Sequence, residues 1–399
     1  MKRLLEAPHR LFFFFAVVQL LAASAWWAAT LVLRARGYPP PLAEGLDAVR
    51  VHAFLMVYGF FAFFMFGFLF TAGPRWLQMA APARREYIPA GIAMGAAGIL
   101  LYPALAAGGF FLVICAALLA AAWLCNAMRF AGLVAKSAVA DKQHAKLVAV
   151  AVSAGGIGVV VFAAGIAIGS DRLLHVSQSI GVWAFLVPLF CTVCHRMLPF
   201  FTANALPFVK PWRPGWLLAA LYAGSLAHGM LEALAWPQWL WIVDLPLAIV
   251  GFSISTRWGV AKTLANKLLA MLHLGFLWIG IAFALHAVQS LLLLAGIAAM
   301  GLAPVHAFTI GFLASVTLAM VSRVSCGHSG RTLAADRLTW YAFLVLQLAA
   351  VLRVAADLWP AHYAALLLAA IGCWLACFGS WAWRYLPLYW RPRADGLPG

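Results

Sequence analysis

Residues 11–33 read LFFFFAVVQLLAASAWWAATLVL, a run of 23 residues without a charged side chain. A helix of about 20 apolar residues is long enough to span the hydrocarbon core of a bilayer. The run directly follows Lys2, Arg3 and Arg10, and no convincing signal-peptide cleavage site ends it. The stretch therefore predicts a retained membrane-spanning helix at the start of the chain.

The rest of the chain has the same character. Of its 399 residues, 66% are hydrophobic and only 10% are charged, whereas a soluble domain is about 45–50% apolar and about 25% charged. A water-soluble fold is excluded, because so few polar side chains cannot cover so large a core. Further apolar runs lie at residues 50–72, 88–106, 109–132, 147–168, 174–195, 215–234, 240–256, 268–290, 303–322, 339–357 and 361–384. They predict an all-α membrane protein of about twelve helices, with residues 1–399 forming a single membrane domain.

The basic residues test this helix count. The formal net charge is +16, from 27 Lys and Arg against 11 Asp and Glu. With twelve helices, 22 of the 27 basic residues fall on the side of the N-terminus, and only Arg34, Arg36, Arg50, Arg172 and Arg353 fall on the other. Cytoplasmic loops are enriched in Lys and Arg, so both termini are predicted to be cytoplasmic. The bilayer accounts for the positive charge, and no nucleic-acid partner is needed.

Six of the eleven histidines fall in one outer slab, each on a different predicted helix: His52, His175, His228, His286, His306 and His362. A polar side chain inside a membrane is costly and is a functional candidate by default. Neutral imidazole is also the commonest side-chain ligand of metals and haem. The alternative is that each ring bonds a backbone carbonyl or faces lipid headgroups, which is the favoured interpretation for His9, His144 and His362.

Helix geometry separates one histidine from this slab. His273 and His286 share a helix but are thirteen residues apart, which is roughly 20 Å along the axis. They cannot bind the same ion, so His273 is a candidate for the inner half alone. Intramembrane carboxylates are scarce and lie near helix ends (Glu232, Asp244 and Asp357). Their scarcity disfavours a proton pump or a carboxylate-bridged di-iron site, and leaves imidazole, Met and Cys as the available ligands.

Two polar stretches lie at the inner ends of helices. Residues 322–331 read SRVSCGHSGR and carry Arg323, His328 and Arg331, and Arg196 lies in a second stretch at 195–202. Guanidinium groups and backbone amides of this kind bind anions such as haem propionates or lipid phosphates. The alternative is a positive-inside anchor followed by a turn. The nearby sequence Cys191-Thr-Val-Cys194-His195 has the c-type haem pattern, but its cytoplasmic position favours free buried thiols.

Several stretches together resemble the NnrS family, a bacterial inner-membrane family linked to nitric oxide. They are PHRLFF at 8–13, VHAFLMVYGF at 51–60, GFLFTA at 67–72, RMLPFFT at 196–202, HLGFLW at 273–278, HAFTIG at 306–311 and MVSRVSCGHSGR at 320–331. The resemblance implies twelve helices, haem and copper binding, nitric oxide as a ligand and protection against nitrosative stress. The family often has His-Ala-His-Glu-Met where this chain has His52-Ala-Phe-Leu-Met56.

A more distant resemblance is to haem–copper oxidases and nitric oxide reductases. Those proteins also have twelve helices, and their second and tenth helices carry the haem ligands. By this analogy His52 and His306 would be the axial ligands of a b-type haem, with Met56 lining it. His175, His228 and His286 would be candidates for a second haem or a copper site. The paired histidines of those enzymes' seventh helix are absent here.

Three functions follow from these patterns. The first is a haem and copper membrane protein that senses, binds or reduces nitric oxide, with enzymatic turnover left open. The second is a transporter or channel for a metal or a metal–ligand complex, although internal repeats and midplane charges are lacking. The third is an assembly partner of another haem enzyme. The electron donor and the oligomeric state are not predicted.

Overall fold

The computed structural model describes residues 2–43, 45–206, 208 and 210–396, and within these ranges it contains helices and no strand. The α-helices, in chain order, are α1 Pro8–Ala35, α2 Ala48–Phe54, α3 Ala62–Trp76, α4 Arg84–Ala107, α5 Gly109–Lys136, α6 Gln143–Ile168, α7 Asp171–Ser179, α8 Val187–Ala205, α9 Gly215–Ala233, α10 Trp241–Arg257, α11 Val260–Thr263, α12 Lys267–Leu294, α13 Ala303–His306, α14 Ser315–His328, α15 Arg337–Leu358 and α16 Tyr363–Tyr385. This confirms the predicted all-α, multi-pass membrane fold.

Three π-helical segments join pairs of these helices into longer stretches. They are η2 Leu55–Phe61 between α2 and α3, η3 Ile180–Leu186 between α7 and α8, and η5 Ala307–Ala314 between α13 and α14. Each begins within five residues of a histidine (His52, His175 or His306). π-Helical turns are rare and are frequent at functional sites. The apolar runs do not predict these segments, because hydrophobicity alone does not distinguish a π-turn from an α-turn.

Ten helical stretches in the described part of the chain are long and apolar enough to cross a membrane. The other two predicted segments correspond to α9 and α10. Helix α10 has 17 residues, which span about 26 Å, and α9 has 19 residues that include His228 and Glu232. Both helices contribute polar side chains to the interior of the second unit, and their crossing of the membrane stays a prediction.

Two predicted helix ends need correction. Helix α8 extends to Ala205 and α14 extends to His328, so the inner polar stretches are mostly helical. The backbone N–H groups of residues 322–328 lie within α14, where they are used by the helix and cannot cradle an anion. After the helix, the N–H of Arg331 donates to the carbonyl of Cys326. The side chains of Arg323 and Arg331 remain candidate anion ligands in this stretch.

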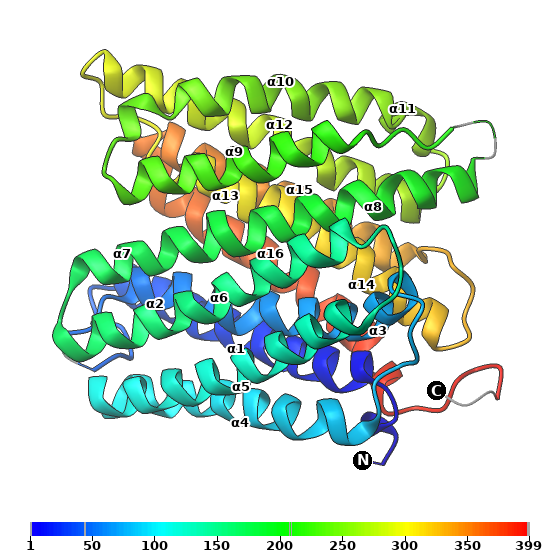
Figure 1. Ribbon diagram of the computed structural model, residues 1–399. Helices are drawn as coiled ribbons and strands as arrows, with labels where there is room; N and C mark the ends of the chain where they lie inside the picture. Colours follow the sequence, from blue (N-terminus) through cyan, green and yellow to red (C-terminus); the bar gives the residue numbers. More distant parts are fainter. Residues whose placement is uncertain (1, 44, 207, 209, 397–399) are drawn as a thin grey trace. The chain divides into compact units, whose positions relative to one another are not determined.

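The chain divides into two compact units. The first comprises Met1–Leu189, His328–Gly330 and Ala382–Gly399, and the second comprises Phe190–Gly327 and Arg331–Trp381. In the first unit α4, α5 and α6 lie side by side (Figure 1). One face of α4 carries Gly91, Gly95 and Gly98, and a Cβ added at each would meet α1. Helices α1 and α4 therefore pack closely along this face.

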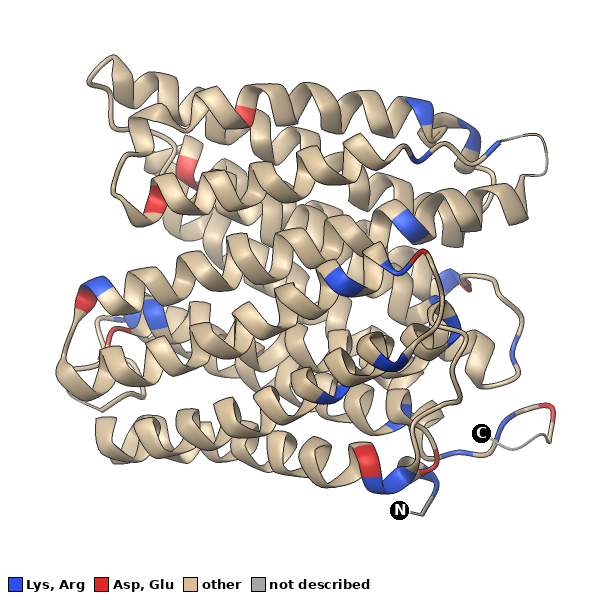
Figure 2. Ribbon diagram, viewed as in Figure 1, with Lys and Arg blue, Asp and Glu red and all other residues tan. Residues whose placement is uncertain are grey.

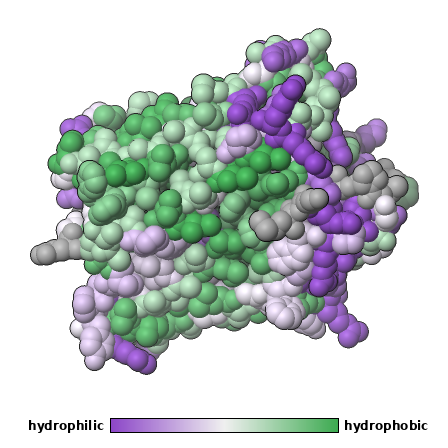
Figure 3. Space-filling view, turned by 90° about the horizontal axis from the view of Figure 1, so that it is seen from below, coloured by the Kyte–Doolittle hydropathy of each residue, from purple (hydrophilic) through white to green (hydrophobic). Residues whose placement is uncertain are grey.

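Charge and hydropathy agree with a membrane environment. Within each unit most Lys and Arg residues lie toward one end of the helices (Figure 2). In the first unit Arg50 and Asp171, which lie at the starts of α2 and α7, form an ion pair of 3.2 Å. Helices α2 and α7 therefore begin at the same end of the unit, as the topology predicts. Figure 3 shows one face of the molecule with a broad hydrophobic middle and hydrophilic residues mainly at its margins. Large apolar side chains such as Phe110 and Ile99 are exposed, as expected for contact with lipid.

Candidate metal centre

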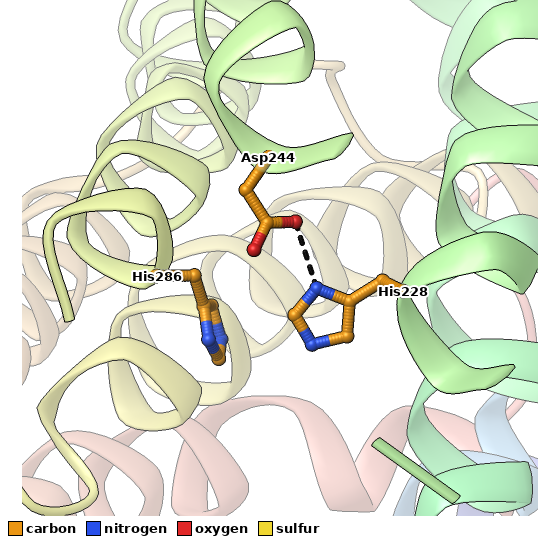
Figure 4. A group of neighbouring side chains, drawn as sticks. All are labelled: His228, Asp244 and His286. Carbon is orange, nitrogen blue, oxygen red and sulfur yellow. Dashed lines mark hydrogen bonds and ion pairs between the residues drawn. The ribbon is translucent and has the colours of Figure 1, made fainter. Parts of the chain in front are cut away.

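Three ionisable side chains converge inside the second unit. They are His228 from α9, Asp244 from α10 and His286 from α12, and Figure 4 shows them pointing toward one another. One ligand atom from each lies within 4.8 Å of the others. All three residues are buried, with exposed fractions of 0%, 0% and 5%. Among the described residues, this is the one group of three or more His, Cys, Asp or Glu with metal-ligand spacing.

The contacts within the cluster are short and directional. Nδ1 of His228 lies 2.7 Å from Oδ1 of Asp244. The ring centroids of His228 and His286 are 4.7 Å apart, and the two ring planes make an angle of 80°. Glu232 follows His228 by one helical turn, and its Oε1 lies 3.6 Å from Nε2 of His228. The side chain of Glu232 is 27% exposed. The cluster therefore offers two imidazoles and two carboxylates.

Close contacts between helices bring these residues together. A Cβ on Gly251 of α10 would lie 3.0 Å from the backbone of Gly280 in α12, so the two helices touch at this point. Asp244 precedes Gly251 by seven residues, and His286 follows Gly280 by six, which is about 10 Å in each case. Because the helices are antiparallel, both side chains reach the same end of the pair.

A backbone hydrogen bond fixes the start of α10. The N–H of Trp241 donates to Oγ of Ser290 over 3.0 Å, and Ser290 lies one turn beyond His286 on α12. Helix α9 approaches α10 at another glycine, since a Cβ on Gly224 would lie 2.6 Å from Cδ1 of Leu247. Gly224 is one turn before His228, so this contact brings the histidine against Asp244.

The buried carboxylate needs a compensating charge. Burying an ion in the membrane is expensive unless it is paired. Oδ2 of Asp244 is buried and makes no hydrogen bond to the residues that the structure describes. A metal cation held by imidazole and carboxylate donors supplies that compensation, and this donor set suits first-row transition metals such as Cu, Fe and Zn. The residues therefore fit a transition-metal ion.

The contact between Gly251 and Gly280 leads to a testable prediction. Gly251→Val is expected to force α10 away from α12, because the added methyl groups meet backbone that cannot rotate away. We expect a loss of about 1–3 kcal/mol in stability and weaker binding of added Cu²⁺. Thermal unfolding and metal titration in detergent measure both effects.

Gly372→Val in α16 is the matched control, since a Cβ there meets nothing within 4 Å. Equal loss of copper affinity in both variants would contradict the proposed role of the α10–α12 contact.

Two other predicted ligands lie outside the cluster. His175 is exposed on α7, in the first unit. His273 is buried on α12, and its Nε2 lies 2.8 Å from Oγ1 of Thr202. Because Thr202 donates its proton to the carbonyl of Leu198, the imidazole donates through Nε2–H, and its buried Nδ1 carries the lone pair. His273 is thus a separate imidazole with its orientation fixed by Thr202.

The two predicted axial histidines lie in different units, so their pairing stays a prediction. The ring of His52 stacks on Trp27, with centroids 4.1 Å apart at 12°. His306 places Nδ1 2.9 Å from the carbonyl of Leu302. That hydrogen bond places the proton on Nδ1 and leaves the lone pair on Nε2. A histidine that binds a metal through one ring nitrogen commonly donates a hydrogen bond through the other. His306 therefore fits an axial ligand, and Met56 lies within η2 after His52.

The residues predicted to bind an anion at the inner ends of the helices make separate contacts in the described part of the chain. The guanidinium of Arg323 lies 4.1 Å from the ring centroid of Phe201. The ring of His328 lies 4.5 Å from that of His9, and both residues belong to the first unit. Arg196 is partly exposed in the middle of α8, and Arg331 follows α14.

Distance along one helix separates these inner residues from His306. Arg323 and His328 follow His306 by 17 and 22 residues in the continuous stretch Ala303–His328, which is about 25 and 33 Å. A haem ligated by His306 is too far away to place its propionates on them. If the inner arginines bind an anion, it is a different group.

Asp244 and Glu232 are site residues that the sequence does not single out. Both belong to the few intramembrane carboxylates, whose scarcity leaves imidazole, Met and Cys as the ligands that the sequence predicts. A signal was present, because one predicted helix ends after His228 and the next begins before Asp244 on the same outer side. Depth along the membrane therefore already placed the carboxylate level with His228 and His286.

Comparisons with known proteins give one result. No curated protein matches the chain. The family profile described as NnrS protein matches residues 3–393, which is nearly the whole sequence and includes all three residues of the cluster. The chain therefore belongs to the NnrS family.

Proposed function

We propose that this NnrS-family chain is a haem- and copper-binding protein of the bacterial inner membrane that binds or turns over nitric oxide and so protects the cell from nitrosative stress. The observation that carries the proposal is the convergence of buried His228, Asp244 and His286 from three helices. Such a costly arrangement inside a membrane indicates a functional site. In the predicted topology it lies toward the outer leaflet.

The chemistry of the cluster suits a small diatomic ligand. When bound, the metal would have an open coordination position, since the few protein donors of the cluster leave room for a further ligand. The imidazoles of His228 and His286 would donate to it, and Asp244 would balance its charge. Aromatic rings line one side, with Phe308 5.9 Å from His286 and 4.7 Å from Phe283. This apolar wall limits access of water and ions, whereas nitric oxide is small, uncharged and soluble in the membrane.

The haem part of the proposal rests on His306 and on the family. The hydrogen bond between His306 and the Leu302 carbonyl presents Nε2 as a haem ligand does. His52 is the proposed second axial ligand of a b-type haem. The histidine cluster in the second unit is then left for copper.

An optical spectrum with metal analysis tests this function. The purified, haem-replete protein is expected to show a Soret band that shifts when nitric oxide is added, and to retain bound copper. A haem-replete preparation with no Soret band and no bound metal would overturn the proposal. If that preparation instead carries metal ions into proteoliposomes, the chain is a transporter.

A further inference from the structure

Building on the proposed metal site, we infer that Asp244 is a positioning residue and not a metal ligand. It holds Nδ1–H of His228, so that Nε2 of His228 faces the metal. Glu232 and His286 then complete the donor set for a divalent transition-metal ion. The inference adds Glu232 as a ligand and names the ligating atom of His228.

The distance between His228 and Asp244 identifies their contact. At 2.7 Å, Nδ1 and Oδ1 have the separation of a charge-assisted hydrogen bond. Two atoms that both bind one ion at about 2.0–2.2 Å in a tetrahedral site lie about 3.4 Å apart. An ionised carboxylate can only accept, so the proton of this bond is on Nδ1. In this ring, the nitrogen available to a metal is therefore Nε2.

A second potential metal ligand lies near Nε2 of His228, at the separation expected for two ligands of one ion. Oε1 of Glu232 lies 3.6 Å from it, close to the separation of two ligands on one ion. The two residues are four apart on α9, so a single helix face presents both. The ring of His286 lies across from His228, at nearly a right angle, and supplies the other imidazole.

Charge balance selects a divalent ion. Two neutral imidazoles with the carboxylates of Glu232 and Asp244 carry a total charge of −2. A divalent cation makes the buried group neutral, whereas a monovalent ion leaves a net charge that is costly in the membrane. A ligating histidine whose other ring nitrogen donates to a carboxylate is also a common arrangement in metal sites.

Matched variants of the full-length protein separate the two roles. Copper is removed with a chelator, Cu²⁺ is added back, and electron paramagnetic resonance reports its ligand atoms. Asp244→Asn is expected to keep the copper g values and hyperfine coupling of the wild type while the affinity, measured by chelator competition, falls about 10–100-fold. Glu232→Gln is expected to shift the hyperfine coupling, because a charged oxygen ligand is lost. The opposite pattern would show that Asp244 ligates the ion directly.

Asp357→Asn is the control. Asp357 is another buried carboxylate of the second unit, paired with Arg353 at 2.7 Å, and its replacement should change neither the copper spectrum nor the affinity. Size-exclusion chromatography and circular dichroism verify that each variant is folded.

A measurement on the metal-free wild type keeps the inference separate from the proposed function. Solid-state ¹⁵N NMR of the imidazoles, with His228→Asn used to assign the signal, is expected to show a protonated Nδ1 on His228. A bare Nδ1 overturns the inference even if copper binds. A wild-type protein that binds no Cu²⁺ overturns the proposed copper function, whatever the NMR result.

Discussion

His286→Ala is expected to lower the Cu²⁺ affinity of the centre by on the order of 100-fold or more, since even residues behind the ligands contribute 10–100-fold. The variant removes one of two buried imidazoles that converge with Asp244, and the carboxylates beside the cluster do not restore a nitrogen ligand. Copper analysis after purification, with chelator competition, measures the loss. His228→Ala should give a loss of the same size.

His273→Ala is the control for this prediction. It removes a buried histidine from the same helix, thirteen residues away, that contacts Thr202. The loss of packing is similar, so any general destabilisation of α12 appears in both variants. Equal loss of copper from the two would show that the cluster is not the binding site.

His306→Ala is expected to remove the low-spin haem spectrum. Its Nδ1 contacts the Leu302 carbonyl, so Nε2 is the nitrogen that would hold the haem iron, and alanine has no replacement ligand. His52→Ala is expected to have the same effect, because a low-spin haem needs both axial ligands. Reduced-minus-oxidised optical spectra of the purified variants measure the loss.

His362→Ala is the control, since His362 is exposed in the short helix Pro360–His362 and is predicted to face lipid headgroups. It should leave the spectrum unchanged. A low-spin spectrum that survives in both His52→Ala and His306→Ala would refute bis-histidine ligation. The copper content of His306→Ala should also stay at the wild-type value, because the haem and copper sites use different residues.

Much of the fold follows from hydrophobicity alone. The run at 11–33 became α1, and the remaining apolar runs all became helices. Backbone N–H and C=O groups in a membrane must form hydrogen bonds within the segment. An apolar run of that length is therefore strongly favoured to form a helix. Glycine spacing was informative too, since Gly91, Gly95 and Gly98 do pack against α1.

Features that depend on backbone detail were not predictable in this way. The helices that end at Ala205 and His328 continue beyond their apolar runs, because a polar helix end can project into the headgroup region without cost. The π-helical segments after His52, His175 and His306 also have no hydrophobic signature. They widen the helix where side chains from neighbouring helices need space: in η3, for example, a Cβ on Gly181 would meet Val57 and Tyr58 of η2.

The candidate site shows where sequence reasoning reaches its limit. Topology gave the depth of His228 and His286, because depth is a count of residues along a helix. It could not show that these two histidines meet each other or that Asp244 joins them. That choice depends on which helices are neighbours and how each is rotated, and it is decided by contacts such as Gly251 against Gly280 and Gly224 against Leu247.

Hydrophobicity along the chain is enough to identify a helical membrane protein, and the positions of the basic residues and histidines predict its orientation and the depth of each histidine. The packed helices show that His228 and His286 lie together, and that Asp244 joins them from another helix. Hydrophobicity acts on each segment separately, whereas a metal site needs side chains from several segments within a few ångströms. Lateral packing of helices sets those distances.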